Sequence, residues 1–446
     1  MYAEEQRKRI LNILANFVIV CFEAISFLFV WDKYYVTENY QGGYVSVAFI
    51  YLLFLFLITK SFNGYKINYM RIKDLCFSHT FAIILSGIIG YIVICLAWSD
   101  YIDPLPLIVM CVIQIVFANL WVYFVRHVYL HIYHPRKIII IYGNYPLQDF
   151  MEKLNTRTDK YQVGEILNYQ KGLERICSQV LDFEGVVLYD LPAESRNVIM
   201  KYCYKHSIRT YVVPKITDII MKGSDDLHLV DTPLMLSRNQ GLHVDQRFVK
   251  RTMDIIISVV GIILMSPVMC LIAVAIKICD RGPVFYRQIR LTRDGKKFRI
   301  FKFRSMKTDA EKNGAQLAEK NDDRVTAIGK FLRVSHLDEL PQLFNVFAGD
   351  MSIVGPRPER PEIFAEYEET IPEFEYRLKV KAGITGYAQV YGKYNTKPID
   401  KLKMDLTYIQ EYSYLLDIKL MLMTLSVVFR KEKSEGVEKD FTKEVK

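Results

Sequence analysis

The sequence lacks any pair of cysteines at the C-x-x-C spacing, although it contains eight cysteines among its 446 residues. Zinc sites and disulfide frameworks need closely and regularly spaced cysteines, so neither is expected to organise this chain. Four of the cysteines fall inside apolar runs, where a reduced and buried thiol is the expected state. The first apolar run is too long for a signal peptide, and no small-residue cleavage site follows it.

The composition excludes two further classes of protein. Hydrophobic residues make up 51% and aromatic residues 13%, whereas a disordered chain is polar and poor in aromatics. Charged residues make up 24%, which is too many for a transporter that lies entirely in a membrane. The sequence therefore predicts several membrane segments joined to a large aqueous part. The net charge of +9 indicates either a diffuse excess or a basic patch that faces an anion.

Four apolar runs occupy the first 130 residues, and each is close to the ~20 residues that cross a bilayer. They are Ile10–Trp31, Tyr44–Thr59, Phe81–Trp98 and Leu105–Val125. Lysine and arginine are frequent before the first run, between the second and third, and after the fourth, but absent from Ser99–Pro104. The positive-inside rule then predicts a four-helix unit, residues 1–135, whose two ends face the cytoplasm. Glu23 within the first run is expected to face the bundle interior, with a transport site as the alternative.

Residues 136–244 show short apolar strands that alternate with polar helical stretches, which is typical of a parallel sheet. The strands are expected at 137–142, 185–189 and 209–213. The first strand is followed by Gly143-Asn-Tyr-Pro, so the G-x-G-x-x-G that lets backbone approach a pyrophosphate is missing. A scaffolding or regulatory module is therefore favoured over a dinucleotide site.

A fifth apolar run, Ile255–Ile276, has basic residues on both sides and Ser266-Pro267 at its centre. Proline cannot donate a helical hydrogen bond, and the serine hydroxyl can bond back to a preceding carbonyl. Two structures fit: a reentrant helix, 252–279, that breaks at Ser266 and Pro267 and returns to the same side, or a proline-kinked helix that crosses. The basic flanks favour the reentrant helix.

Eleven lysines and arginines lie between Lys277 and Lys307, against Asp280 and Asp294 alone. Asp294-Gly295 separates two alternating runs, which is a strong hairpin signal. Contact with anionic lipid headgroups or with a phosphate substrate is favoured over a merely solvated hairpin.

Adjacent carboxylates at Asp338 and Glu339 follow Arg333 and precede Pro341. Neighbouring carboxylates repel each other and need a cation. With Mg²⁺, one can act as ligand or nucleophile and the other as base or second ligand, although surface Asp-Glu pairs are also common.

Two loops offer phosphate-binding groups. Arg357 stands between two prolines, which would present its guanidinium rigidly to a phosphate. Gly383-Ile-Thr385-Gly386 offers backbone amides at a turn. Each alone is also compatible with an ordinary turn.

Taken in order, these motifs resemble the bacterial sugar transferase family, the monotopic phosphoglycosyl transferases, over about residues 246–436. The resemblance is carried by Lys250-Arg-Thr-Met-Asp254, Ser266-Pro267, Gly282-Pro-Val-Phe-Tyr-Arg287, Lys302-Phe-Arg-Ser-Met306, Leu337-Asp-Glu-Leu-Pro-Gln342, Gly349-Asp-Met-Ser-Ile-Val-Gly-Pro-Arg-Pro358, Gly383-Ile-Thr-Gly386 and Ser413–Asp417. The four helices and the α/β module resemble the long-form polyprenyl glycosylphosphotransferases, such as those that transfer galactose phosphate to undecaprenyl phosphate.

The resemblance implies three parts: an α-helical membrane bundle, a degenerate Rossmann-like α/β module, and a mixed α/β monotopic catalytic domain, 245–446, with the reentrant helix. It implies that Asp338 is the nucleophile, that Glu339 assists Mg²⁺ binding or proton handling, and that both carboxylates can hold the metal. Substrate-binding groups are expected at Lys302, Arg304, Arg333, Arg357, Gly383, Thr385 and Gly386.

The implied reaction moves a sugar-1-phosphate from a UDP-sugar to undecaprenyl phosphate through an aspartyl-phosphosugar, releasing UMP. It would be the first membrane step of exopolysaccharide, capsule or O-antigen assembly, at the cytoplasmic face of the bacterial inner membrane. Anionic lipids are expected partners, nucleic acid is not, and a homodimer is compatible with the extra domains. His336 and Tyr391-Gly-Lys393 depart from the family pattern, and the second departure leaves the sugar open.

Two rival classes remain. A membrane nucleotide-sugar dehydratase or epimerase can also join four helices to an α/β domain, but it needs the missing glycine motif. A non-enzymatic membrane scaffold would make the carboxylates surface charges.

Overall fold

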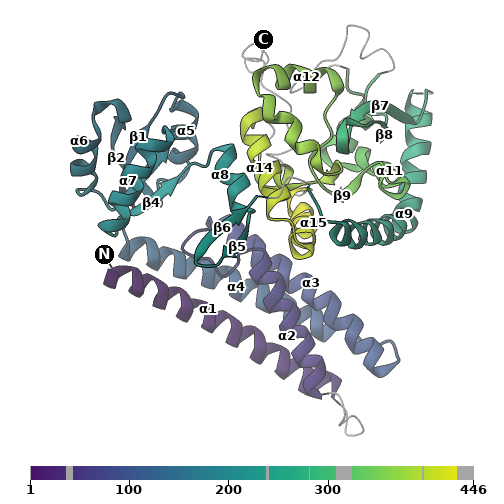
Figure 1. Ribbon diagram of the computed structural model, residues 1–446. Helices are drawn as coiled ribbons and strands as arrows, with labels where there is room; N and C mark the ends of the chain where they lie inside the picture. The colour runs from purple at the N-terminus through teal and green to yellow at the C-terminus, as the bar shows by residue number, and fades with distance from the viewer. Residues whose placement is uncertain are drawn as a thin grey trace. The chain divides into compact units, whose positions relative to one another are not determined.

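A computed structural model of the chain describes residues 2–36, 44–237, 241–280, 282–307, 324–393 and 396–428. The chain divides into two compact units, Met1–Val213 and Pro214–Lys446. The first contains the apolar N-terminal helices and an α/β module, and the second contains the acidic pair and the remaining motifs (Figure 1).

The first unit begins with four apolar helices, as the hydropathy pattern predicts. They are α1 (Tyr2–Val30), which continues into a π-helical turn at Trp31–Tyr35, α2 (Tyr44–Ser61), α3 (Ile72–Trp98) and α4 (Leu105–Ile132). By length and composition α1, α3 and α4 can each cross a membrane, while the apolar part of α2 is shorter. Large apolar side chains such as Leu96 and Leu120 remain exposed on their outer faces, which is expected of helices whose solvent is lipid.

Polar side chains meet inside these helices around Glu23, which is 1% exposed and faces the interior as expected. Its carboxylate lies 3.8 Å from Nδ1 of the buried His79 on α3. Gln114 on α4 donates to the Glu23 carbonyl at 3.0 Å, and the Tyr51 hydroxyl donates to Gln114 at 2.9 Å. These contacts join all four helices through groups that lipid could not satisfy.

The α/β module is a four-stranded parallel sheet in the order β2-β1-β3-β4. Its strands are β1 (Arg136–Tyr142), β2 (Tyr161–Asn168), β3 (Gly185–Tyr189) and β4 (Arg209–Val212), joined through α5 (Gln148–Asn155), α6 (Leu173–Val180) and α7 (Ala193–Lys205). The three expected strands and their parallel arrangement are confirmed. Strand β2 escapes the sequence pattern because its side chains alternate between exposed and half-buried positions instead of forming a continuous apolar run.

The carboxyl end of β1 is closed by the chain's own backbone. The Gly143 amide donates to the Tyr189 carbonyl at 2.9 Å, and a Cβ at Gly143 would lie 1.9 Å from the Asp190 carbonyl oxygen. This glycine is therefore required for packing between the loops that follow β1 and β3. Its amide is not turned toward a ligand.

The second unit has short strands between many helices (Figure 1). Its strands are β5 (Asp225–Leu229), β6 (Thr232–Leu236), β7 (Phe285–Leu291), β8 (Lys297–Phe303), β9 (Ser352–Val354) and β10 (Gly383–Thr385). Its helices are α8 (Ile216–Lys222), α9 (Val244–Asp280), α10 (Ala327–Val334), α11 (Gln342–Ala348), α12 (Pro361–Thr370), α13 (Tyr387–Tyr391), α14 (Pro398–Gln410) and α15 (Tyr414–Val428).

The predicted hairpin is confirmed: β7 and β8 pair antiparallel, and Asp294 and Gly295 at the turn have φ of 59° and 70°. Positive φ at both residues is what a tight hairpin turn requires, and Asp-Gly provides it at little cost. Strands β9 and β10 pair in parallel beside them.

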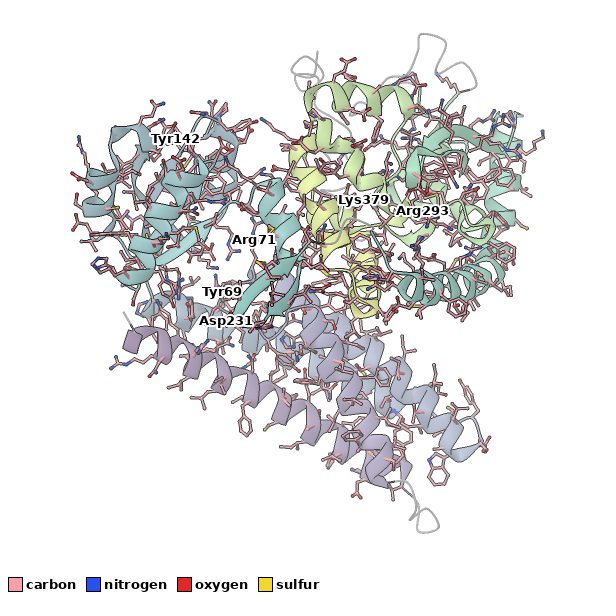
Figure 2. All side chains as sticks on the ribbon, viewed as in Figure 1. Tyr69, Arg71, Tyr142, Asp231, Arg293 and Lys379 are labelled. Atoms are coloured by element: carbon pink, nitrogen blue, oxygen red, sulfur yellow. The ribbon has the colours of Figure 1, made fainter. Side chains whose placement is uncertain are left out.

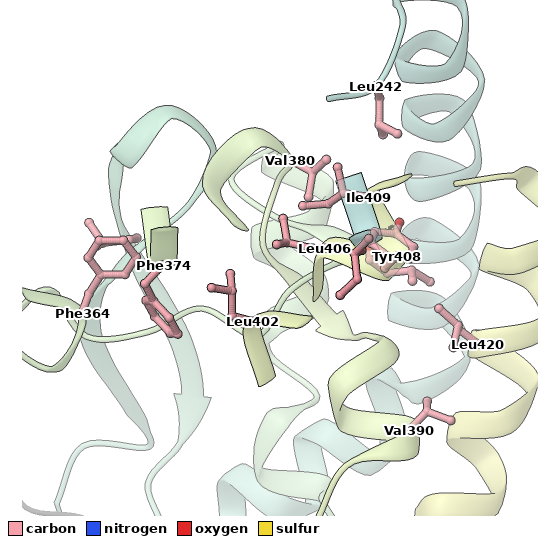
Figure 3. Packing of buried hydrophobic residues seen from close by; sticks show 13 residues of the cluster. Leu242, Phe364, Phe374, Val380, Val390, Leu402, Leu406, Tyr408, Ile409 and Leu420 are labelled. Atoms are coloured by element: carbon pink, nitrogen blue, oxygen red, sulfur yellow. Dashed lines mark hydrogen bonds between the residues drawn. The ribbon is translucent and has the colours of Figure 1, made fainter. Parts of the chain in front are cut away.

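The core of the second unit gathers around α14. Leu402, Leu406 and Tyr408 on α14 pack with Phe374 and with Leu420 of α15, and each is at most 1% exposed (Figure 3). These residues recur at helical spacing on one face of α14, so the amphipathic pattern of 398–410 builds the core directly. This core holds in place the loops that carry the candidate site.

Helix α9 is continuous through Ser266 and Pro267, so the helix does not end at this pair. Figure 1 shows α9 as two arms that meet at a corner. The Ser266 hydroxyl donates to the Ile263 carbonyl at 2.8 Å, which compensates one carbonyl that the proline leaves without its usual donor. Gly261 packs against Leu343 of α11, whereas Met269, Ile272 and Ile276 pack with Phe303 and Leu332.

Candidate functional site

The two adjacent carboxylates lie on a single helical turn, Leu337–Glu339, between α10 and α11. Helix α10 starts at a Thr326 cap, whose hydroxyl accepts from the Gly329 amide at 3.0 Å. After α10 ends, His336 adopts a left-handed φ of 55°, which reverses the chain direction and turns Asp338 inward. Asp338 is thereby left only 8% exposed.

Glu339 is bound by two cations. Its Oε1 lies 2.6 Å from Lys302 Nζ on β8 and 2.9 Å from Arg357 Nη2. Burial alone would raise the pKa of this carboxyl, but Arg357 and Lys302 outweigh it and hold the pKa well below the ordinary glutamate value. Glu339 is therefore an ionised anchor, and its low basicity makes it a poor proton acceptor.

Asp338 is in the opposite situation. Within the described part of the chain, no hydrogen bond or ion pair to its carboxylate is found. Burial raises its pKa above the ordinary aspartate value, and Glu339 adds to the rise, while Lys302 and Arg333 oppose it. A desolvated carboxylate without a bonded partner is a better nucleophile than one held by hydrogen bonds, because no donor has to be displaced.

Arg357 reaches the site from a loop fixed at several points. The Gly355 amide donates to the Thr385 carbonyl at 2.8 Å, and the Gly383 amide donates to the Pro356 carbonyl at 2.9 Å. Arg377 donates to the Arg357 carbonyl at 3.0 Å. The Arg357 side chain keeps 47% exposure, so its guanidinium can bind Glu339 and still meet a ligand.

The Gly383 amide, which was expected to bind substrate, donates to a carbonyl of the protein itself. A Cβ at Gly386 would lie 2.1 Å from the Gly355 carbonyl oxygen, so the absent side chain lets two loops touch. The Thr385 hydroxyl lies 2.6 Å from that of Thr424. The structure thus gives Gly383, Thr385 and Gly386 a part in holding the Arg357 loop, and their contact with substrate stays a prediction.

Of the remaining predicted cations, Arg333 lies on α10 just before the acidic pair, and Arg304 directly follows β8. Arg333 donates to the Ser305 hydroxyl at 2.9 Å and lowers the pKa of Asp338, which places its charge near that carboxylate. Arg304 is 6% exposed and packs against Gly282, where a Cβ would lie 2.0 Å from its Nη1. Gly282 in the Gly-Pro motif is therefore small because Arg304 fills that space.

A buried ionic network behind the Arg357 loop was not anticipated from the sequence. Arg377 donates to Asp405 at 2.9 Å, and Glu359 lies within 3.5 Å of both Arg377 and Lys401. Although burial opposes it, Lys401, Arg377 and Arg290 lower the pKa of Glu359 to about 2. One feature of the sequence indicates this network: Asp405 lies between two core leucines, on the apolar face of the 398–410 helix.

Motif residues at the start of α9 tie that helix to the rest of the second unit. Asp254 Oδ1 accepts from the Ser352 hydroxyl and from the Ile353 amide, both at 2.9 Å. Lys250 Nζ lies 2.5 Å from Asp417 on α15. Arg251 donates to the Val346 and Phe347 carbonyls in the last turn of α11. Three separate motifs therefore meet at one helix.

A divalent cation at the acidic pair would need further ligands besides the two carboxylates. Among the described residues no group of three or more His, Cys, Asp or Glu side chains is arranged for a metal. Both of these contacts to Glu339 use Oε1, so Oε2 takes part in neither of them. Mg²⁺ is commonly bound by one or two carboxylates plus substrate phosphates, so this donor set fits Mg²⁺ bound with a diphosphate.

These features define a membrane-associated α/β protein with a carboxylate pair set among cations, as phosphoryl transfer requires. The family model described as "Bacterial sugar transferase" matches residues 245–431. The chain belongs to the bacterial sugar transferase family and is an enzyme of that family.

Three curated relatives extend the comparison. A UDP-N-acetylgalactosamine-undecaprenyl-phosphate N-acetylgalactosaminephosphotransferase of Aeromonas hydrophila is 35% identical over 61% of this chain and 67% of its own length. A UDP-glucose:undecaprenyl-phosphate glucose-1-phosphate transferase of Escherichia coli K12 is 42% identical over 46% of this chain and 44% of its own length. A galactosyl transferase, CpsE, of Streptococcus agalactiae is 39% identical over 40% and 42%.

Proposed function

We propose that this protein transfers a sugar-1-phosphate from a UDP-sugar to undecaprenyl phosphate and releases UMP. The relatives from Aeromonas and Escherichia carry this reaction type in their names, although the match to the latter spans less than half of its length. The observation that carries the proposal is a contrast between two adjacent carboxylates: Glu339 is fixed by Lys302 and Arg357, whereas Asp338 has no bonded partner among the residues that the structure describes. One carboxylate is anchored and the other is available for covalent chemistry.

The proposed reaction has two displacements at one phosphorus. An Asp338 oxygen attacks the phosphorus that bears the sugar, the bond to the UMP oxygen breaks, and UMP leaves with the electron pair. An oxygen of the polyprenyl phosphate then attacks the same phosphorus, the bond to Asp338 breaks, and the free carboxylate returns. Splitting the transfer in this way avoids bringing both large substrates into one transition state.

The cations around Asp338 have separate tasks in this scheme. Arg357, half exposed while bound to Glu339, contacts the diphosphate and offsets its developing charge. Lys302 keeps Glu339 ionised and adds a second positive charge beside Asp338. Asp338 and Glu339 Oε2 would hold Mg²⁺ together with diphosphate oxygens, and the ion would supply charge neutralisation at the reacting phosphoryl group.

The proposal includes a membrane arrangement. The bend in α9, its exposed apolar residues Ile263, Leu264 and Leu271, and its anchored first turns support a helix that dips into one leaflet and returns. Both ends of α9 then stay on the cytoplasmic face of the inner membrane, where UDP-sugars are found. Tags inserted before Ile255 and after Ile278 should both be cytoplasmic, and a periplasmic second tag contradicts this arrangement.

Full-length protein in detergent, supplied with Mg²⁺, undecaprenyl phosphate and a panel of UDP-sugars, tests the reaction through UMP release. We expect UMP from at least one UDP-hexose, none with Asp338→Asn, and normal turnover with Glu362→Gln, which alters an exposed carboxylate on α12. Undiminished UMP release from Asp338→Asn would show that Asp338 is not the nucleophile. A cofactor-dependent change in the sugar without UMP would favour a dehydratase or epimerase.

A further inference from the structure

A pocket in the first unit lies where four segments of the chain converge, well separated in sequence from the acidic pair. Lys8 of α1, Tyr69 of the α2–α3 connection, Tyr129 near the end of α4, and Lys160 before β2 all line it. Figure 2 labels Tyr69 and Arg71, which lie between the helices and the α/β module. The pocket is thus at the end of the helices that the positive-inside rule assigns to the cytoplasm.

Among the lining residues that the structure describes, cations outnumber carboxylates. Lys8, Arg126, Arg136 and Lys160 line it, and among the described lining residues the one carboxylate is Asp159. Arg126, which is 2% exposed, pairs with Asp159 and also donates to the Ile67 carbonyl at 3.0 Å. Asp159 is further engaged by Arg157 from outside the lining at 3.1 Å. The Asp159 carboxylate is therefore paired with two arginines.

Lys160 lies among these cations and against two aromatic rings. Its Nζ lies 3.8 Å from the centre of the Tyr69 ring and 5.2 Å from that of Tyr161. Burial, followed by the charges of Arg157 and Arg136, lowers the pKa of Lys160 to about 8. Burying an amine among like charges is unfavourable, and an anion bound beside it would relieve both causes.

Aromatic rings hold the cations toward the pocket. Lys8 Nζ lies 4.8 Å from the Tyr133 ring centre, and the Arg126 guanidinium lies 5.6 Å from the Tyr129 ring centre. Tyrosine at the end of a membrane helix is typical of the headgroup region, where its ring lies in apolar surroundings and its hydroxyl meets polar groups. Ammonium, guanidinium and hydroxyl donors from different directions suit an anion with several acceptor oxygens.

We propose that this pocket binds a phosphate group, carried either by an anionic lipid headgroup or by a soluble phosphate compound. The site is formed jointly by the membrane helices and the α/β module, since Arg126 and Asp159 come from one each and Arg157 also donates to the Tyr69 carbonyl at 2.8 Å. A bound phosphate would therefore fasten the module to the helices. The α/β module would then bind its ligand at the amino ends of β1 and β2, away from the closed carboxyl end of β1.

Amine labelling of the full-length protein tests this proposal at the residue concerned. The protein in maltoside micelles is treated briefly with acetic anhydride at pH 7.5, and acetylation of Lys160 is compared by peptide mass spectrometry with that of Lys201, which is exposed on α7. The probes are phosphatidylglycerol, phosphatidylcholine and inorganic phosphate. Near saturation we expect labelling of Lys160 to fall about tenfold, with Lys201 unchanged.

The arms of the experiment separate the sources of the phosphate. Protection by phosphatidylglycerol alone identifies an anionic headgroup, and protection by inorganic phosphate identifies a soluble ligand. Arg136→Gln should abolish protection, whereas Lys137→Gln, which changes an exposed neighbour, should retain it. The proposal is overturned if no probe lowers the acetylation of Lys160, or if the probes lower that of Lys201 equally. It is also overturned if a probe protects Lys160 in Arg136→Gln as well as in the native protein. None of these outcomes depends on sugar transfer.

Discussion

Lys250 and Asp417, which are 167 residues apart in the chain, form a buried ion pair of 2.5 Å that joins the start of α9 to α15. Their side chains are 8% and 4% exposed. Tyr408 donates to the other Asp417 oxygen at 2.8 Å. Burial raises the pKa of Asp417 although Lys250 and Tyr408 oppose the rise, so this carboxylate depends on its partners for its charge.

Breaking that pair should destabilise the second unit strongly. Lys250→Met leaves Asp417 buried without its cation, and we expect a loss of about 3–5 kcal/mol in the free energy of unfolding. Lys250→Met with Asp417→Leu removes both charges and should recover part of the loss. Thermal unfolding in detergent measures both variants. Lys222→Ala, which breaks an exposed ion pair with Glu411, is the control and should change stability by less than about 1 kcal/mol. If Lys250→Met and Lys222→Ala lowered the free energy of unfolding equally, this account would be contradicted.

Asp338→Asn should abolish turnover without lowering stability. Burial raises the pKa of Asp338, so this carboxyl is harder to ionise in the folded protein than in the unfolded chain. The stability that this group contributes is complete below the ordinary aspartate pKa and is lost as pH rises through the raised value. At pH 7 the neutral amide should therefore leave the melting temperature unchanged or increase it. A fall of several degrees, with Glu362→Gln unaffected, would mean that Asp338 serves structure.

Glu359→Gln should reveal a pH-dependent contribution of the opposite sign. The pKa of Glu359 is lowered to about 2 despite burial, so its contribution is present above the ordinary glutamate pKa and is lost as pH falls toward 2. We expect a destabilisation of order 3 kcal/mol at pH 7, which shrinks as the pH is lowered from about 5. Unfolding of native and variant protein at pH 7, 5 and 4 checks this. A constant difference between the two proteins would contradict the assigned network.

Arg377 should act as a positioning residue for Arg357. It donates to the Arg357 carbonyl and to Asp405 and lies 3.5 Å from Glu359, and a lysine cannot reach all three. Arg377→Lys should lower kcat up to about a hundredfold through displacement of the Arg357 loop. A parallel measurement with Arg357→Lys should show a similar loss, and the double variant should lose little more. Additive losses would show that the two arginines act independently.

Much of the fold follows from local pattern. The apolar runs predict α1 to α4, and Asp294-Gly295 predicts the β7–β8 hairpin, because each depends on residues close in sequence. The strand pattern also finds β1, β3 and β4. It misses β2, whose alternating exposure resembles that of polar segments.

The site was predictable in its residues and only partly in its contacts. Asp338, Glu339, Lys302 and Arg357 are marked by sequence, and the structure brings Lys302 and Arg357 onto the same oxygen of Glu339. The asymmetry between the two carboxylates could not be predicted, because it arises from partners 18 and 37 residues away. The bond from the Gly383 amide to the Pro356 carbonyl could not be predicted either, because the two groups lie in different loops.

The most direct test of the central claim is a single turnover without the lipid acceptor. Full-length protein is mixed with Mg²⁺ and the UDP-sugar that gave UMP, but no polyprenyl phosphate, and its peptides are then examined by mass spectrometry. We predict up to one equivalent of UMP and a hexose-phosphate adduct on the peptide that contains Asp338, which undecaprenyl phosphate then removes. UMP release that requires the lipid from the start, with no adduct at Asp338, would contradict the covalent mechanism.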